Sequence, residues 1–309
     1  MLAEVCALVE RGVLEVTLLG RNVGSRAAHC AEHCESSSRS ALLDLLRACR
    51  TIEGLERVRL VSADLADFTD EVVEAMAATP NICPQVHLSL RSGSDRVLAD
   101  MRRAYRRADF VRCVEKVRAA MPYASISTDV IVGFPGESEA DFQQTLSLVR
   151  EVRFATAFTY RYAIRSGPTT VAACDQVTRA VARERMARLT AAQEQISLEG
   201  NQALLGSTVE LLVTGGLDKS DTGSRWMCGR TRDGRLAHLQ PARGGPIRVG
   251  EIVTVQITGA AQHHVVADAG VRGHCHSRAS GSYGPRTVPG KFGLGVPVIE
   301  VRFPQRAEL

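Results

Sequence analysis

The chain has 309 residues, 45% of them hydrophobic and 23% charged, a composition that is ordinary for a globular protein. Its length suits one large domain and one small one, and no apolar run approaches the roughly 20 residues needed to span a bilayer. A net charge of +4 is too small to identify a nucleic-acid-binding protein without regard to where the charges lie.

The first residues, MLAEVCALVE, are acidic where a signal peptide has a basic start. Nine cysteines, an odd number spread along the chain, indicate reduced thiols in place of a disulfide framework. We therefore expect a cytoplasmic protein that makes no contact with membranes.

The excess positive charge lies in the last segment of the chain. From residue 271 to 309, six basic residues stand against two acidic ones, a difference equal to the whole net charge of +4. We expect residues 271–309 to form a basic flexible tail. Any RNA contact made by the body of the protein must then come from local basic patches.

The first 160 or so residues alternate short β-branched runs with amphipathic stretches, a pattern typical of helices that cover a parallel sheet. The predicted strands are Leu14–Leu19, Arg57–Val61, Gln85–Leu90, Ser125–Val132 and Ala155–Tyr162. The predicted helices between them are Ser40–Arg50, Asp70–Ala78, Ser94–Arg102, Ala108–Met121 and Ser138–Glu151.

The helical spacing of Leu2, Val5, Leu8 and Val9 predicts a helix that ends at Arg11 and Gly12. A parallel βα unit begins with a strand that leads into its helix, and no such strand precedes this helix in the sequence. We therefore expect the first strand of the barrel, and whatever came before it, to be missing from the chain.

After the predicted sheet, residues 175–206 read as a long polar connector helix. Residues 207–270 then change to short alternating strands separated by glycine-rich turns, among them Asp233-Gly234, which is a good hairpin signal. Five short strands in this interval favour a small barrel of the OB-like kind.

Several segments resemble the MiaB-like radical-SAM methylthiotransferases, which add a methylthio group to a modified adenosine beside the tRNA anticodon. The resemblance is carried by Val16–Val23, Ser92–Leu98 with Met101–Arg103, and Thr128–Glu137, and it continues through Glu184–Met186 and Gln193–Ile196 into a TRAM-like module at Ser207–Asp268. It implies an α/β fold, with a partial radical-SAM (β/α) barrel over 1–174, the connector, and a small all-β OB-like TRAM barrel over 207–270.

The resemblance also implies cofactors and sites. The family uses S-adenosylmethionine and 4Fe-4S clusters, and it presents its cofactor at the carboxyl ends of the barrel strands. Carried over onto matching positions, the cofactor-binding residues are Gly20, Asn22, Arg91, Ser92, Asp129, Gly133, Pro135, Gly136 and Glu137. No catalytic residue and no protein partner is predicted.

The expected macromolecular partner is tRNA. Without the resemblance, the basic residues expected to hold it would be interpreted as ordinary surface charges, and the resemblance favours contact with RNA. One group flanks an aromatic residue, Tyr105, and the other lies near a hairpin of the small barrel. The predicted RNA-binding residues are Arg102, Arg103, Arg106, Arg107, Arg225, Arg230, Arg232 and Arg235.

The chain departs from the family where the cluster is held, because it contains no CxxxCxxC loop. Cys30 and Cys34 imitate its first spacing, but Ser37 stands at the third position, and the segment follows the wrong strand. A zinc site at His29–Cys34 is disfavoured because the two (i, i+4) pairs diverge on one helix. Cys275 with its neighbouring histidines is a second weak candidate for a metal site. Because both candidates are weak, we predict no metal ligands.

A smaller departure is Arg91, which stands where the family has glutamine in LPLQSGS. This arginine adds positive charge beside a cationic sulfonium, so the site needs a compensating carboxylate. We expect a methylthiotransferase of the MiaB type that is inactive as this chain alone. A non-catalytic RNA-binding remnant from a split or decayed gene is the alternative.

Overall fold

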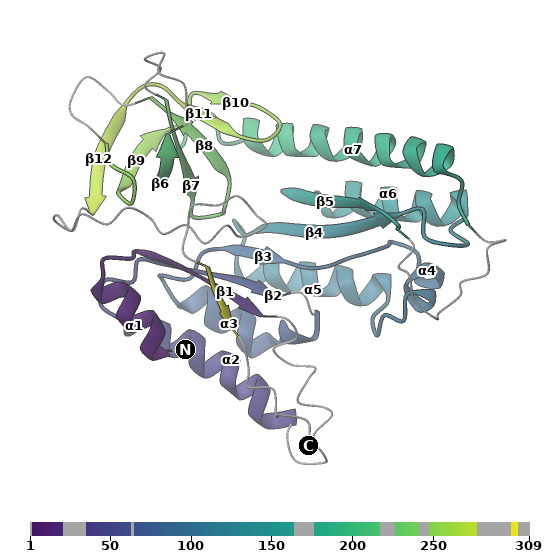
Figure 1. Ribbon diagram of the computed structural model, residues 1–309, viewed down its shortest axis with the longest axis horizontal. Helices are drawn as coiled ribbons and strands as arrows, with labels where there is room; N and C mark the ends of the chain where they lie inside the picture. The colour runs from purple at the N-terminus through teal and green to yellow at the C-terminus, as the bar shows by residue number, and fades with distance from the viewer. Residues whose placement is uncertain are drawn as a thin grey trace.

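The computed structural model describes residues 2–20, 35–62, 65–163, 176–216, 226–240, 247–276 and 298–301. The first part of the chain alternates helices and strands (Figure 1). Its elements are α1 Leu2–Glu10, β1 Glu15–Gly20, α2 Glu35–Cys49, β2 Arg57–Ser62, the 3-10 helix Leu65–Asp67, α3 Asp70–Ala78, β3 Gln85–His87, α4 Asp95–Asp100, α5 Arg107–Ala120, β4 Ser125–Val132, α6 Glu139–Val152 and β5 Thr156–Arg161.

The strands of this part are all parallel and lie in two ladders, β13-β1-β2 and β3-β4-β5, where β13 is Val298–Val301. A bridge between Val58 and Ile82 connects β2 to the segment before β3, so the ladders form one curled layer. This is the parallel half-barrel that the alternating pattern predicted.

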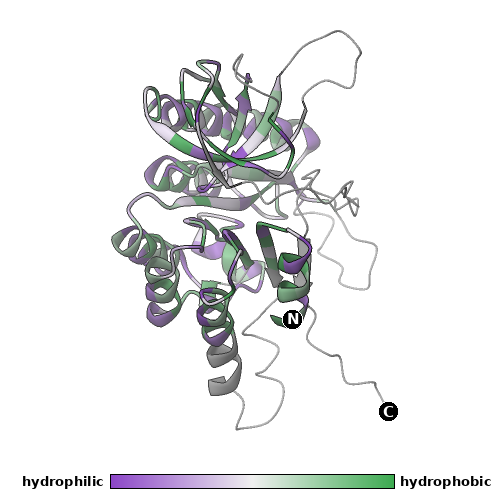
Figure 2. Cartoon of the chain, turned by 90° about the vertical axis from the view of Figure 1, so that its left-hand side faces the viewer, coloured by the Kyte–Doolittle hydropathy of each residue, from purple (hydrophilic) through white to green (hydrophobic). Residues whose placement is uncertain are grey.

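One face of the layer is apolar and packs against the helices. Leu18, Leu60, Leu88 and Val130 are each no more than 3% exposed and join one core with helix residues such as Phe110. Because successive side chains of a strand point to opposite faces, the residues between them lie on the concave face. Those residues are mostly polar. Figure 2 shows hydrophobic and hydrophilic residues alternating along the helices, as amphipathic helices require.

A long helix, α7 Arg179–Gln202, packs beside β5 and α6 and leads to a second β structure (Figure 1). Its strands form a seven-stranded sheet in the order β10-β11-β8-β7-β6-β9-β12 with its own apolar core. They are β6 Thr208–Gly216, β7 Met227–Thr231, β8 Leu236–Leu239, β9 Ile252–Gln256, β10 Gly259–Ala260, β11 Val265–Ala267 and β12 Val271–His276. We call residues 208–276 the β module.

Two predicted boundaries differ in the structure for local reasons. Strand β3 ends at His87, not Leu90, because the Leu90 amide bonds the hydroxyl of Thr128, at 3.0 Å, in place of a backbone carbonyl. Helix α2 begins at Glu35, five residues before the predicted Ser40.

The prediction of a flexible tail over 271–309 also differs from the structure. Strand β12 pairs with β9, and β13 pairs in parallel with β1 at the outer edge of the sheet. Apolar alternation in Val298–Val301 was the signal for the second strand, and the basic character of the segment obscured it.

Candidate functional site

Polar side chains from β3, β4 and the loop after β3 meet on the concave face of the curled layer. His87 lies with Nδ1 3.0 Å from the Ser127 hydroxyl and Nε2 3.3 Å from Asp129 Oδ2. The Ser89 hydroxyl donates to the same Asp129 oxygen at 2.9 Å, and Arg91 Nη2 lies 3.4 Å from it. The Asp129 carboxylate is therefore surrounded by three side chains, His87, Ser89 and the cationic Arg91.

The surroundings of Asp129 keep it ionised. Burial alone would raise the pKa of the carboxyl, but the hydrogen bond from His87 and the charges of His87 and Arg91 outweigh burial and hold the pKa below its ordinary value. The contacts that Asp129 makes with these groups all use Oδ2. This carboxylate meets the expectation that Arg91 requires a compensating negative charge.

Arg91 itself is held in an unusual backbone conformation, with φ of 65°. Its amide donates to the Asp129 carbonyl at 2.8 Å, and its carbonyl accepts from the Ile131 amide at 2.8 Å, which fixes this residue against β4. The buried Nε of Arg91 has no hydrogen-bond partner among the described residues. A left-handed residue with an unsatisfied donor is a feature typical of functional sites.

The neighbouring Ser92 points elsewhere. Its side chain is fully buried, with Oγ 3.3 Å from the Thr145 hydroxyl of α6 and accepting from the Ser94 amide at 3.2 Å. In this structure Ser92 therefore anchors the turn to the helix layer, and its hydroxyl does not face the concave side.

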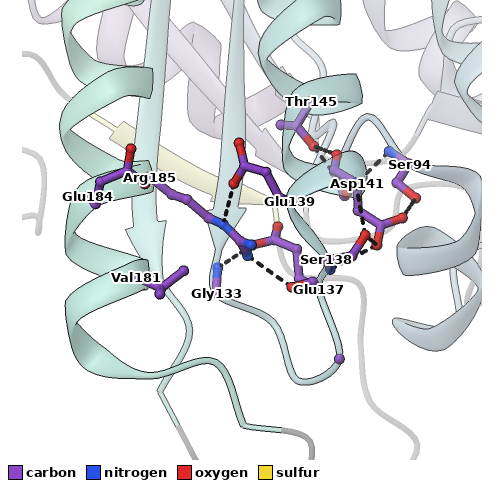
Figure 3. Close-up of polar contacts among 12 residues, drawn as sticks. Ser94, Gly133, Glu137, Ser138, Glu139, Asp141, Thr145, Val181, Glu184 and Arg185 are labelled. Atoms are coloured by element: carbon purple, nitrogen blue, oxygen red, sulfur yellow. Dashed lines mark hydrogen bonds and ion pairs between the residues drawn. The ribbon is translucent and has the colours of Figure 1, made fainter.

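The loop from Gly133 to Glu137 connects β4 to α6 (Figure 3). Both Gly133 and Gly136 have φ of 75°, a conformation that side chains with a Cβ rarely adopt. The Gly133 amide donates to Glu137 Oε2 at 2.9 Å, so the loop closes on its own carboxylate. Pro135 is buried within the loop and Gly136 is exposed.

Helix α7 fixes this loop through a buried ion pair. Arg185 Nη1 lies 2.8 Å from Glu137 Oε2 and donates to the Glu137 carbonyl at 2.9 Å, with both side chains at most 5% exposed (Figure 3). Burial raises the pKa of the Glu137 carboxyl above its ordinary value, although Gly133 and Arg185 act against it. The second oxygen of Glu137, Oε1, is buried without a partner among the described residues.

The start of α6 is organised around Asp141 (Figure 3). Its carboxylate accepts from the Ser94 hydroxyl at 2.6 Å, from the Ser138 amide at 2.9 Å and from Arg96 Nη2 at 2.5 Å. Burial would raise the pKa of this carboxyl, but the hydrogen bonds from Arg96, Ser138 and Ser94 hold it well below the ordinary value. Asp141 therefore joins α4 to α6 beneath the site.

Aromatic residues of β5 line the same concave face. Phe158 and Tyr160 are 42% and 48% exposed, and they pair in register with Asp129 and Ile131 of β4. The Phe158 ring lies 6.1 Å from the His87 ring. Neither His87 nor these aromatics were predicted from the sequence, although the period-two alternation of β3 and β5 places them opposite the buried residues.

At the other end of the strands, the concave face is closed by a hairpin of the β module. Arg57 donates to the carbonyls of Arg230 and Glu210 at 2.9 and 3.2 Å. Arg59 donates to the carbonyls of Thr231 and Arg232 at 2.8 and 3.1 Å, and it forms a two-pronged pair with Glu15 at 2.9 and 3.0 Å. We call this set of contacts the amino-end clamp.

Three predicted RNA-binding arginines make hydrogen bonds within the chain near the clamp. Arg232 donates to the Pro80 carbonyl, Arg230 to the Gly234 carbonyl at 3.2 Å, and Arg235 to Asn201 Oδ1 at 2.6 Å. Burial lowers the pKa of Arg230. These guanidinium groups therefore make hydrogen bonds within the chain. Arg225 lies outside the described residues.

The four arginines around Tyr105 are placed differently. Arg102, Arg103 and Arg106 are exposed, whereas Arg107 pairs with Glu151 at 2.6 Å and donates to the Gln144 carbonyl at 2.7 Å. The Tyr105 hydroxyl donates to the Ser89 carbonyl at 2.6 Å. This link connects the basic segment to the loop that follows β3 and carries Arg91.

No group of three or more His, Cys, Asp or Glu side chains that could hold a metal ion occurs in the part of the chain that the structure describes. Gly20 ends β1 at the carboxyl edge, but Asn22, the His29–Cys34 segment and the side chains of Cys275 and its neighbouring histidines lie outside that part. Among the described helices, none is long and apolar enough to cross a membrane.

Comparison with known proteins shows which sequences this chain resembles. Residues 2–149 match the model of the Radical SAM superfamily. The chain is 54% identical over 312 aligned residues to a tRNA-2-methylthio-N(6)-dimethylallyladenosine synthase of Nocardia farcinica, an alignment that covers 99% of the chain and 62% of the relative. A synthase with the same description from Mycobacteroides abscessus is 50% identical, with 100% and 62% covered.

The chain therefore spans about three fifths of the length of these relatives. Among solved structures, it overlaps a radical S-adenosylmethionine methyltransferase from Kitasatospora setae, with a TM-score of 0.42 and 14% identity over 71% of this chain and 37% of that one. This overlap is too low to add to the argument.

Proposed function

We propose that the chain belongs to the radical-SAM proteins of the MiaB-like methylthiotransferase family and forms part of an enzyme that methylthiolates tRNA. The proposed reaction adds a methylthio group to N6-isopentenyladenosine beside the anticodon. The observation that carries the proposal is the identity of 54% in an alignment that extends over 99% of the chain.

Radical-SAM chemistry implies S-adenosylmethionine and a 4Fe-4S cluster, and the described residues fit only the first. For a cluster, three thiolates must converge. The free cysteines in the described part, Cys6, Cys49, Cys83, Cys113 and Cys228, lie on separate elements or loops. Burial raises the pKa of both Cys49 and Cys113 to about 11, which disfavours their thiolates. No reaction step through a cluster is derived from this chain.

For S-adenosylmethionine, the carboxyl edge offers suitable groups. The buried Nε of Arg91 has no hydrogen-bond partner among the described residues, and it can donate to a carboxylate oxygen of a ligand. The turn at Gly133–Glu137 places backbone groups at the carboxyl edge of the sheet, where they can contact a nucleoside. Gly20, Asn22, Asp129 and the Ser92 turn complete the proposed cofactor site, in which Ser92 acts by positioning the turn.

For tRNA, the structure favours the exposed arginines over those of the β module. Arg102, Arg103 and Arg106 are open to solvent and follow the loop that carries Arg91. We assign phosphate contacts to them, with Arg107 as a weaker contributor because Glu151 already neutralises it. The β module keeps its proposed role as a TRAM-like RNA-binding unit through surfaces other than the clamp.

Reconstitution tests the enzymatic proposal. The 309-residue chain would be incubated anaerobically with iron and sulfide, and its iron content and cleavage of S-adenosylmethionine to 5′-deoxyadenosine would be measured under strong reductant. Four bound irons with cleavage would support catalysis by this chain. Binding of S-adenosylmethionine in calorimetry, with neither cluster nor cleavage, would limit the chain to holding the cofactor and substrate.

The absence of a CxxxCxxC sequence favours a second candidate, RNA binding without catalysis. The two candidates differ in their need for cofactor. If tRNA binds with equal affinity in the presence and absence of S-adenosylmethionine, and no cleavage occurs after reconstitution, the non-catalytic role is supported.

A further inference from the structure

We propose that Phe158 and Tyr160 form a wall on which the target adenine of the tRNA stacks with its N6 substituent. The inference rests on the proposed function and deepens it, since it names the surface that recognises the base. The two rings are large, apolar and about half exposed, and they belong to the same face as the polar cluster of His87 and Asp129.

The register of the sheet fixes the orientation of the two rings. Phe158 pairs with Asp129 and Tyr160 pairs with Ile131, and paired residues of parallel strands point to the same face. On the opposite face, Val130 is fully buried against the helices. Phe158 and Tyr160 therefore face the concave side, and the 6.1 Å separation between the rings of Phe158 and His87 agrees with this direction.

The wall continues to the carboxyl edge. Tyr162 lies two residues beyond Tyr160, and its ring packs edge-on against Phe134 of the cofactor-proposed loop with centroids 5.1 Å apart. Alternate residues of a strand are separated by about 6.6 Å, so Phe158 and Tyr160 together span the length of a purine with an apolar branch. A ligand on this wall would end beside the proposed cofactor loop.

The chemistry of the surroundings fits an N6-substituted adenine. Exposed aromatic rings stack unpaired bases in RNA-binding proteins irrespective of sequence, so a further group must provide the choice of base. Asp129 is held ionised, and its contacts with His87, Ser89 and Arg91 all use Oδ2. A carboxylate oxygen accepts from an N–H donor, which N6-substituted adenine retains, and Tyr160 and Ile131 supply an apolar surface for the substituent.

Binding of two RNA hairpins to the 309-residue chain tests the proposal. Both would be anticodon stem-loops, one with N6-dimethylallyladenosine and one with unmodified adenosine at the same position. Fluorescence anisotropy would be measured for the wild type, Phe158→Ala, Tyr160→Ala and the control Tyr123→Ala. Tyr123 is a matched control because it is 90% exposed and lies away from the concave face, in the α5–β4 loop.

We expect Phe158→Ala and Tyr160→Ala each to raise the Kd for the modified hairpin about tenfold, as loss of one base-stacking ring does, and to reduce the preference for it over the unmodified hairpin. The Kd of Tyr123→Ala stays at the wild-type value. Because Phe158 and Tyr160 are exposed, the thermal unfolding temperatures of the two variants should remain near that of the wild type. An unchanged temperature shows that the variant keeps the fold.

The other outcomes separate the inference from its premise. If the wild-type chain binds neither hairpin, the proposed function fails and the inference fails with it. If the wild type binds and both wall variants bind equally well, only the inference is overturned. If the variants lose S-adenosylmethionine in calorimetry but keep the RNA affinity, the wall holds the adenine of the cofactor, and the assignment to the tRNA base is wrong.

Discussion

The two ends of the parallel sheet present similar polar side chains on the concave face but use them differently. At the amino-terminal end, Arg57 and Arg59 are almost fully buried and donate to backbone carbonyls of the β module. At the carboxyl-terminal end, the polar groups around Asp129 adjoin exposed aromatic rings, and the buried Nε of Arg91 has no partner among the described residues. The eight residues of β4 separate the two ends by about 25 Å.

This difference teaches that an arginine in a β module is not by itself an RNA contact. The carbonyls of Arg230–Arg232 and the guanidinium group of Arg232 join the β module to the parallel-sheet part of the chain, and the guanidinium group of Arg235 joins it to Asn201 of α7. Buried charges remain in a fold only when hydrogen bonds and opposite charges compensate them. The amino-end clamp satisfies this condition except at the buried Nε of Arg57, which has no partner among the described residues, and we infer that the clamp is structural.

The largest expected effect comes from breaking the clamp. Arg59→Met leaves the carboxylate of Glu15, which is 2% exposed, with only the more distant Arg57, 3.9 Å away, to compensate its charge, and it removes the donors to the Thr231 and Arg232 carbonyls. We expect a loss of about 3–5 kcal/mol in the free energy of unfolding. Urea denaturation would measure it.

A double variant provides the control for this loss. In Glu15→Met with Arg59→Met, the carboxylate and the guanidinium of the two-pronged pair are removed together, so the loss should be smaller than the sum of the two single losses. A loss below about 1 kcal/mol for Arg59→Met alone would show that the clamp does not hold the two parts together.

Next in size is the effect of Asp141→Asn, which weakens the scaffold beneath the carboxyl edge. The carboxylate accepts from Ser94, Ser138 and Arg96, and an amide accepts fewer of these bonds and carries no charge for Arg96. We expect about 2–3 kcal/mol of destabilisation by denaturation. The control is Asp100→Asn, because Asp100 pairs with the same arginine but is 48% exposed, and its loss should stay under about 1 kcal/mol.

The contribution of Asp141 also depends on pH. Its pKa is lower in the folded protein than in the unfolded chain, so the stabilisation is complete above the unfolded value of about 3.9 and decreases as the pH falls below it. The stability difference between the wild type and Asp141→Asn should be full at pH 7 and smaller at pH 3. An unchanged difference at pH 3 would contradict a lowered pKa.

The smallest effect sharpens the comparison between the two groups of arginines. Arg103→Ala should weaken binding of an anticodon stem-loop several-fold and reduce the slope of log K against log salt by about 1, as loss of one phosphate contact does. Arg232→Ala should leave the slope unchanged because its guanidinium faces Pro80. If Arg232→Ala reduces the slope and Arg103→Ala leaves it unchanged, the RNA contact lies in the β module.

Local patterns predicted most of the fold. The strands at Ser125–Val132 and Arg57–Val61 and the helix at Asp70–Ala78 agree with the structure to within a residue, because alternation and capping are properties of short segments. The sequence did not predict that β13 pairs with β1, since the two strands are more than 270 residues apart and no local signal specifies a partner.

The site was predictable only in part for a related reason. The Gly133–Glu137 turn and Arg91 stand out in the sequence, and the structure places them at one edge. His87 and Phe158 are ordinary strand residues until the register of β3, β4 and β5 brings them together. The arginines of the β module show the opposite case, because their charge is visible in the sequence but their burial is not.

Hydrogen exchange of the chain with and without a bound stem-loop, carrying N6-dimethylallyladenosine, tests the central claim most directly. The account predicts slower exchange in peptides covering 87–91, 129–137 and 158–162, with no change in the clamp hairpin at 230–235. Slower exchange at 230–235, with the carboxyl edge unchanged, would contradict it.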